Sequence, residues 1–90
     1  MASILIGYDL NKTGQDYKEL IDAIKKLANG WWHCLDSTWI IKTEQSCKQV
    51  RDALRLHIDS NDELLVVTLT GEGAWADFND ECSTWLKNSL

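Results

Sequence analysis

This 90-residue sequence lacks the features that mark membrane proteins, disulfide-rich domains and chains of several domains. No apolar run approaches the roughly 18 residues that a membrane-spanning helix needs, and no signal-peptide pattern precedes Ser3. The three cysteines stand at irregular spacing and do not form a recognisable disulfide framework. No linker-like stretch divides the chain. We therefore expect a single cytoplasmic domain over residues 1–90, with reduced thiols and no membrane association.

Basic charge is also scarce. The formal net charge of −5 argues against nonspecific binding of nucleic acid, because Lys and Arg dominate phosphate contacts. The acidic excess is unevenly distributed. Residues 1–58 carry eight basic and seven acidic side chains, whereas residues 59–90 carry one basic and seven acidic side chains. Any polyanion would therefore contact the first two thirds of the chain.

The hydrophobic pattern predicts four strands and three helices. The first strand is expected at 3–9, and a helix ending at Leu27 follows a capping-box-like segment at 13–16. Two strands lie within 31–43 and meet near Asp36 and Ser37. A helix at 46–58, opened by Ser46 and Gln49, is followed by a strand at 63–70 and by a C-terminal helix from about Phe78. The last helix has an apolar stripe of Phe78, Cys82, Trp85 and Leu86.

This order predicts the α+β class, with a ferredoxin-like βαββαβ sandwich and a C-terminal helical extension at about 76–90. In that arrangement, two helices cover one face of the sheet. The strands are nevertheless apolar on both faces, since Leu64 and Val66 alternate with Leu65 and Val67. The second face must therefore be covered by the terminal helix, by another copy of the chain, or by both.

The short motifs within about residues 3–70 resemble the Cas-two family of small CRISPR-associated adaptation endonucleases and their VapD-like toxin relatives. Tyr8-Asp9 falls on the strand-end aspartate that binds metal in the family's nucleases. Ser37 and Trp39 fall on the serine and the aromatic residue between its second and third strands. The resemblance implies a homodimer. It also implies a metal-dependent endonuclease acting on DNA or RNA with Mg²⁺ or Mn²⁺, in antiviral defence or a toxin–antitoxin-like pair.

The sequence departs from the family pattern at three positions and in its C-terminal region. His33, Leu35 and Ile40 stand where the family has Arg, Gln and Glu, and an acidic helical tail with Trp75 and Trp85 replaces a short strand. The resemblance therefore implies a dimer more firmly than it implies cleavage. The alternative function is a noncatalytic dimeric interaction module that binds a partner protein through its acidic C-terminal region.

Asp9 is the candidate catalytic and metal-binding residue. Strand alternation places it on the face opposite Ile4 and Ile6, away from the two covering helices. A two-fold dimer would supply a second Asp9, and the two carboxylates together would suit Mg²⁺. Asp9 has an alternative structural role, in which it accepts hydrogen bonds from backbone amides at 11–14.

Lys42, Lys48, Arg51 and Arg55 are the candidate nucleic-acid-binding residues. The last three are spaced i, i+3 and i+7 along the second predicted helix, and Lys42 precedes that helix. Since Asp52 lies among them, a solvated helix face of mixed charge is the alternative.

Trp31, Trp32 and Trp39 are suited either to stacking on bases or to packing in the core and dimer interface. The two histidines and the cysteines follow no metal-ligand spacing. His33 and Cys34 are adjacent on a predicted strand and should point to opposite faces.

Overall fold

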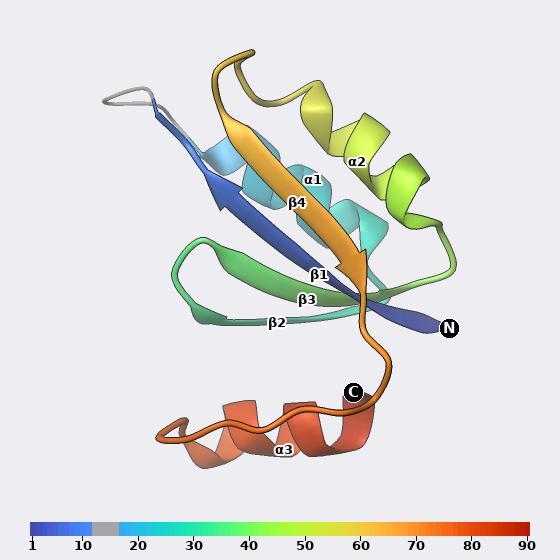
Figure 1. The fold of residues 1–90 in the computed structure, drawn as a ribbon, viewed down its shortest axis with the longest axis vertical. Helices are drawn as coiled ribbons and strands as arrows, with labels where there is room; N and C mark the ends of the chain where they lie inside the picture. Colours follow the sequence, from blue (N-terminus) through green and yellow to red (C-terminus); the bar gives the residue numbers. More distant parts are fainter. Residues whose placement is uncertain (12–16) are drawn as a thin grey trace.

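The described part of the chain forms a small α+β structure with a four-stranded antiparallel sheet and three helices (Figure 1). The computed structural model describes residues 1–11 and 17–90. The elements are β1 (Ala2–Asp9), α1 (Lys18–Leu27), β2 (Gly30–Leu35), β3 (Thr38–Thr43), α2 (Cys47–Arg55), β4 (Glu63–Thr68) and α3 (Asp80–Ser89). The strand order is β2-β3-β1-β4, which is compatible with the predicted ferredoxin-like arrangement. Of the helices described, none is long and apolar enough to cross a membrane.

The predicted start of α2 is confirmed. The Ser46 hydroxyl accepts a hydrogen bond from the Gln49 amide, and the Gln49 side chain accepts one from the Ser46 amide, forming a capping box. The helix ends at Arg55, three residues before the predicted end. For α1, the predicted capping segment at 13–16 lies outside the described residues, and the helix begins at Lys18.

The first face of the sheet, beneath α1 and α2, forms the main core. Ile4 and Ile6 of β1 lie opposite Ile41 and Trp39 of β3, and all four side chains are buried. The two helices complete the cluster with one buried stripe each, consisting of Leu20, Ile24, Val50 and Leu54. Side chains alternate between the two faces along β1 and β3, which directs the four strand residues to the same side of the sheet. The two-residue period of the strands therefore determines which side chains enter this core.

The second face is covered in part by α3, which is one of the covers that the sequence left open. Trp32, Ile40 and Leu86 form a smaller buried cluster, against which the partly buried residues Phe78, Cys82 and Trp85 pack. Asn79 caps the start of the helix, since its side chain accepts a hydrogen bond from the amide of Cys82. In Figure 1, α3 lies across the sheet from α1 and α2, next to β2 and β3.

The cysteine prediction was wrong. Cys34 of β2 and Cys82 of α3 form a disulfide across 48 residues, and Cys47 remains the free thiol. The two cysteines belong to no short sequence motif. They meet only because the fold brings β2 and α3 together. The predicted opposite directions of His33 and Cys34 are confirmed. His33 stacks on Trp39 of the first-face core, whereas Cys34 packs against the second-face cluster.

Candidate functional site

Asp9 lies at the end of β1, directly opposite Glu63 of β4. Both side chains are exposed, and strand alternation places them on the second face with Leu65. Directly opposed residues in an antiparallel pair have their Cβ atoms about 5 Å apart, so the two carboxylates are neighbours of like charge. The sequence singled out Asp9 but missed Glu63, since pairing of β1 with β4 is a long-range contact. Among the described residues, no group of three or more potential metal ligands forms around this pair or elsewhere.

The turn beside Asp9 is organised by another aspartate. One carboxylate oxygen of Asp62 accepts a hydrogen bond from the Asn11 amide at 2.9 Å, and the other accepts one from the Asp59 amide at 2.8 Å. Asn11 also donates its side-chain amide to the carbonyl of Asn61. The amides at 12–14 that Asp9 would bind in the alternative role lie outside the described residues. The candidate metal role of Asp9 therefore stays a prediction.

The other motif residues singled out in the sequence, Tyr8, Ser37 and Trp39, form one connected structural group. The amide of Tyr8 donates to the carbonyl of Ser37 at 3.1 Å, and the indole Nε1 of Trp39 donates to the Tyr8 hydroxyl at 3.2 Å. Trp39 is buried in the main core. These contacts hold the β2–β3 turn against the end of β1, so Tyr8, Ser37 and Trp39 position the strand end from which Asp9 projects.

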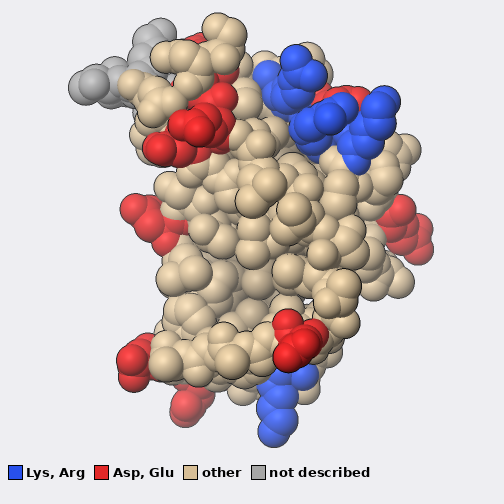
Figure 2. Space-filling view, viewed as in Figure 1, with Lys and Arg blue, Asp and Glu red and all other residues tan. Residues whose placement is uncertain are grey.

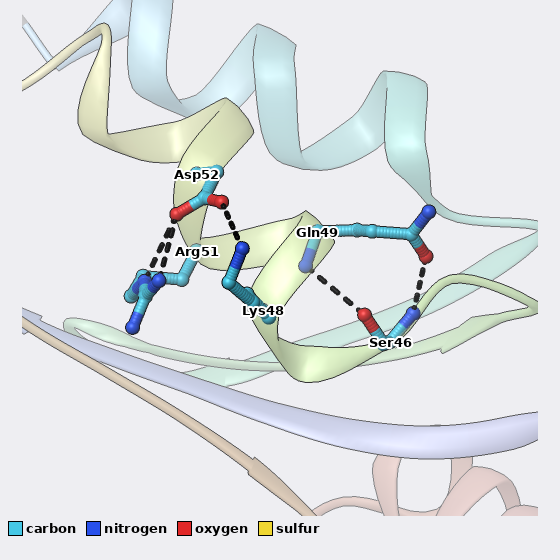
Figure 3. Close-up of polar contacts among 5 residues, drawn as sticks. All are labelled: Ser46, Lys48, Gln49, Arg51 and Asp52. Atoms are coloured by element: carbon cyan, nitrogen blue, oxygen red, sulfur yellow. Dashed lines mark hydrogen bonds and ion pairs between the residues drawn. The ribbon is translucent and has the colours of Figure 1, made fainter.

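The basic residues of α2 form a compact patch, visible over this helix at the upper right of Figure 2. Asp52 binds two of them: its carboxylate lies 3.6 Å from Lys48 Nζ and 2.9 Å from an Arg51 nitrogen (Figure 3). The hydrogen bond from Arg51, with the positive charges of Arg51 and Lys48, lowers the pKa of Asp52. Part of the positive charge of this basic patch is therefore neutralised by Asp52 of the same helix, as the alternative of a helix face with mixed charge predicted.

Arg55 differs from Lys48 and Arg51, because its guanidinium makes no ion pair with any residue in the described part of the chain. Together with Arg51 it lines a surface cavity of about 510 Å³ between α2 and the turn before β4. The same cavity is lined by Asp59 and Asp62, which cancel the two positive charges. This balance of charge makes the cavity a poor site for a phosphate group.

Lys42 does not join the other three basic residues. It lies on the second face of the sheet, with its Nζ 6.0 Å from the centre of the Trp85 ring on α3. The sequence placed Lys42 beside the helix because it is near α2 along the chain. Alternation in β3 instead directs its side chain to the opposite side of the sheet from α2.

The tryptophans of β2 and β3 mainly serve packing. Trp32 and Trp39 are buried, and Trp32 meets Phe78 edge-to-face with ring centres 5.2 Å apart. Trp31 is 44% exposed, but Lys25 Nζ already lies 4.9 Å from the centre of its ring. These contacts favour the packing interpretation over base stacking.

The part of the second face that α3 leaves uncovered carries exposed apolar side chains. Leu65 of β4 is 56% exposed and Val67 is 38% exposed, although both lie in a regular strand. An apolar groove of about 240 Å³ adjoins them on this face, with Leu5, Leu35 and Trp75 among its lining residues. In Figure 2 a broad uncharged surface separates the basic patch from the acidic residues near α3.

Strand β4 is also an edge strand of the sheet. Since the amide of Leu69 donates to the carbonyl of Ser3 in β1, alternation turns the backbone amides of Leu64, Val66 and Thr68 away from β1. An edge strand with outward backbone groups and exposed apolar side chains is a ready template for pairing with another chain.

No protein-family model matches this chain, and no solved structure matches it to a significant degree. The resemblance to the Cas-two family therefore stays a prediction that depends on the motif residues and the order of elements.

Proposed function

We propose that this chain is a ferredoxin-like, noncatalytic interaction module that acts as a homodimer. The observation that supports the proposal best is the edge strand β4, where Leu65 and Val67 are exposed beside an apolar groove. Contiguous apolar surface on a small domain marks an interaction site. Because α3 covers only part of the second face, pairing with another copy would also shield Leu65 and Val67, which stay exposed in the single chain.

The proposed dimer pairs β4 with β4 of a second copy about a two-fold axis. Antiparallel pairing centred on Val66 joins the outward backbone groups of the two strands, and it places Leu65 beside Val67 of the other copy. Such an interface is self-complementary, because each copy contributes the same residues. Extending the sheet to eight strands removes one exposed edge from each copy.

The dimer would present the acidic surface of the C-terminal region to a basic partner protein. Asp80 and Glu81 lie exposed in the first turn of α3, where negative side chains also stabilise the helix dipole. An oligolysine peptide is a suitable probe. The charge-reversal variant D80K/E81K should weaken its binding several-fold, whereas the control Glu44→Lys, at an exposed position directly after β3, should have a smaller effect.

Light scattering at about 50 µM, above the dissociation constant of a moderate interface, tests the dimer. Wild type should give the dimer mass. Leu65→Lys should give the monomer mass, because each copy would place a charge in the apolar contact. Val66→Pro should do the same by removing an outward backbone donor. The matched control is Leu56→Lys, since Leu56 is 82% exposed at the end of α2. A monomeric wild type, or a dimer unaffected by both β4 variants, would contradict the proposal.

A second candidate is metal-dependent hydrolysis of a phosphodiester, as in Cas-two-like nucleases. The observation that favours it is the pairing of Asp9 with Glu63, which gives one chain two adjacent carboxylates. These oxygens suit Mg²⁺ or Mn²⁺, and such an ion, when bound, activates water for attack on phosphorus. In this function, the basic patch of Lys48, Arg51 and Arg55 would contact the nucleic-acid backbone.

A nuclease assay with DNA and RNA in Mg²⁺ or Mn²⁺ distinguishes the two functions. If the chain is a nuclease, Asp9→Asn abolishes cleavage at almost constant volume, whereas Asp36→Asn, in the exposed β2–β3 turn, leaves it intact. Cleavage that survives Asp9→Asn or persists in EDTA rules out the proposed metal site. Absence of cleavage under all conditions favours the interaction module.

A further inference from the structure

The apolar groove on the second face lies between the sheet, α3 and the segment at 69–79. It has a volume of about 240 Å³, and Leu5 of β1, Ile40 of β3 and Leu86 of α3 are among its lining residues. None of the described residues that line it belongs to β4, so pairing of two copies through that strand does not require the groove. A role of the groove is therefore independent of the proposed dimer.

The aromatic side chains in this groove differ in their contacts. Trp32 and Phe78 meet edge-to-face with ring centres 5.2 Å apart, and the Trp32 indole donates to the carbonyl of Cys82, so these rings are held in place. Trp75 is 38% exposed, and it makes no ring contact, cation contact or side-chain hydrogen bond with any residue in the described part of the chain. The Trp75 ring and its Nε1–H group can therefore contact a ligand.

Glu72 carries the one charged side chain among the described residues that line the groove. Its carboxylate is exposed and forms no ion pair with any lysine, arginine or histidine that the structure describes. The surrounding sequence adds to the negative charge, since residues 59–90 carry seven acidic side chains and one basic side chain. An apolar groove with a single unpaired carboxylate is complementary to a ligand that carries one positive charge on an apolar body.

The volume of the groove restricts the size of such a ligand. Pockets that hold drug-sized molecules measure about 300–1,000 Å³, so a groove of about 240 Å³ suits one ring with a short chain. An ammonium group is attracted by a carboxylate and also by the face of a tryptophan ring. Since Glu72 and Trp75 are three residues apart in the sequence and line the same groove, one small ligand can contact both.

We propose that the groove between the sheet and α3 is a binding site for a small arylalkyl ammonium ligand. The apolar ring of the ligand packs against the side of the groove formed by Ile40 and Leu86, which are buried residues of the second-face cluster. The ammonium group binds the Glu72 carboxylate and the face of the Trp75 ring. This site goes beyond the proposed interaction module and does not rest on its dimer.

The experiment titrates the full chain, with its disulfide intact, with 2-phenylethylamine at neutral pH, where the amine is protonated. Two probes of similar size are the controls, because 2-phenylethanol is neutral and phenylacetate is negative. NMR of the indole N–H groups follows binding, and the signal of Trp75 should shift. The amine should bind about tenfold more tightly than the alcohol, because only the amine makes a charge-assisted contact with Glu72. Phenylacetate should bind more weakly than either.

Two pairs of variants test the two contacts. Glu72→Gln removes the charge at almost constant volume and should reduce the affinity for the amine to that for the alcohol. Its matched control is Asp77→Asn, because Asp77 is exposed in the same segment, does not line the groove, and has a positive φ that asparagine also adopts. Trp75→Ala should weaken amine binding several-fold, whereas Trp31→Ala, at a similarly exposed tryptophan on the first face, should not.

Equal affinities of wild type for the amine and the alcohol would overturn the ammonium site, as would full affinity in Glu72→Gln. Shifts confined to indole groups outside the groove, or no binding of any probe at millimolar concentration, would overturn the groove as the binding site. The comparison of the three probes uses wild type, so poor folding of a variant would not obscure the result. Failure of this site would leave the proposed dimer intact, because the Leu65→Lys and Val66→Pro variants test that dimer separately.

Discussion

Among the described residues, eight hydrophobic side chains are buried in one cluster between the sheet and α1 and α2, whereas three are buried between the sheet and α3, where a disulfide is added. On the first face, two amphipathic helices from the middle of the chain cover the strands. On the second face, one C-terminal helix covers β2 and β3, and Leu65 and Val67 of β4 stay exposed. The first face thus forms a closed core, whereas the second face is only partly covered.

Truncation of one leucine in each cluster should show the largest difference between the faces. Leu54→Ala, in the main core, should lower the free energy of unfolding by about 3–4 kcal/mol, because it leaves an enclosed cavity. Leu86→Ala should cost about 2 kcal/mol, since Leu86 borders the open groove and the vacated space joins it. Urea unfolding of both variants measures this. Equal losses would mean that the second face is packed as tightly as the first.

Removal of the disulfide should have the next largest effect. The C34S/C82S variant should lose about 2–4 kcal/mol of stability, because a bond that closes a long loop restricts the unfolded chain. For a domain of this size, the melting temperature would fall by roughly 10–20 °C. Calorimetry should show little change for the control Cys47→Ser. If the double variant has the same melting temperature as the wild type, the disulfide does not stabilise the packing of α3 on the second face.

Substitutions at the helix caps compare the two faces through smaller changes in the free energy of unfolding. Ser46→Ala removes half of the α2 capping box and should cost about 1–2 kcal/mol. Asn79→Ala removes a single capping hydrogen bond from α3, and it should cost about 0.5–1 kcal/mol. Denaturant midpoints of the two variants, measured with the disulfide intact, test this order. A larger loss for Asn79→Ala would indicate that α3 is the more strongly coupled helix.

The smallest expected effect concerns His33 on the first face. Partial burial against Trp39 lowers the pKa of His33 below 6.5, assisted by repulsion from Lys25 and opposed by interactions with Asp36. The folded state therefore disfavours protonation. This contribution to stability is complete above pH 6.5 and declines as pH falls below that value. An NMR titration should give a His33 midpoint below 6.5, and a midpoint above 6.5 would contradict the stacked environment.

Local patterns in the sequence predicted much of the fold. The order of strands and helices, the Ser46–Gln49 capping box and the apolar stripe of α3 all follow from residue spacing, because period and capping are properties of neighbouring residues. The same alternation placed Asp9 on the second face. The local patterns did not indicate that Glu63 lies beside Asp9, or that Lys42 lies on the opposite face from α2. Both facts depend on strand pairing and on which face each helix covers.

The sequence by itself determined the elements, their order and the apolar character of both faces of the sheet. The tertiary structure alone decided how far α3 reaches over the second face, and that Cys34 meets Cys82 across 48 residues. Spacing carries no signal for such contacts, since they form only when the strand order places β2 beside the C-terminal helix. For the same reason, the uncovered edge at Leu65 and Val67 becomes recognisable as a candidate interface only in the folded chain.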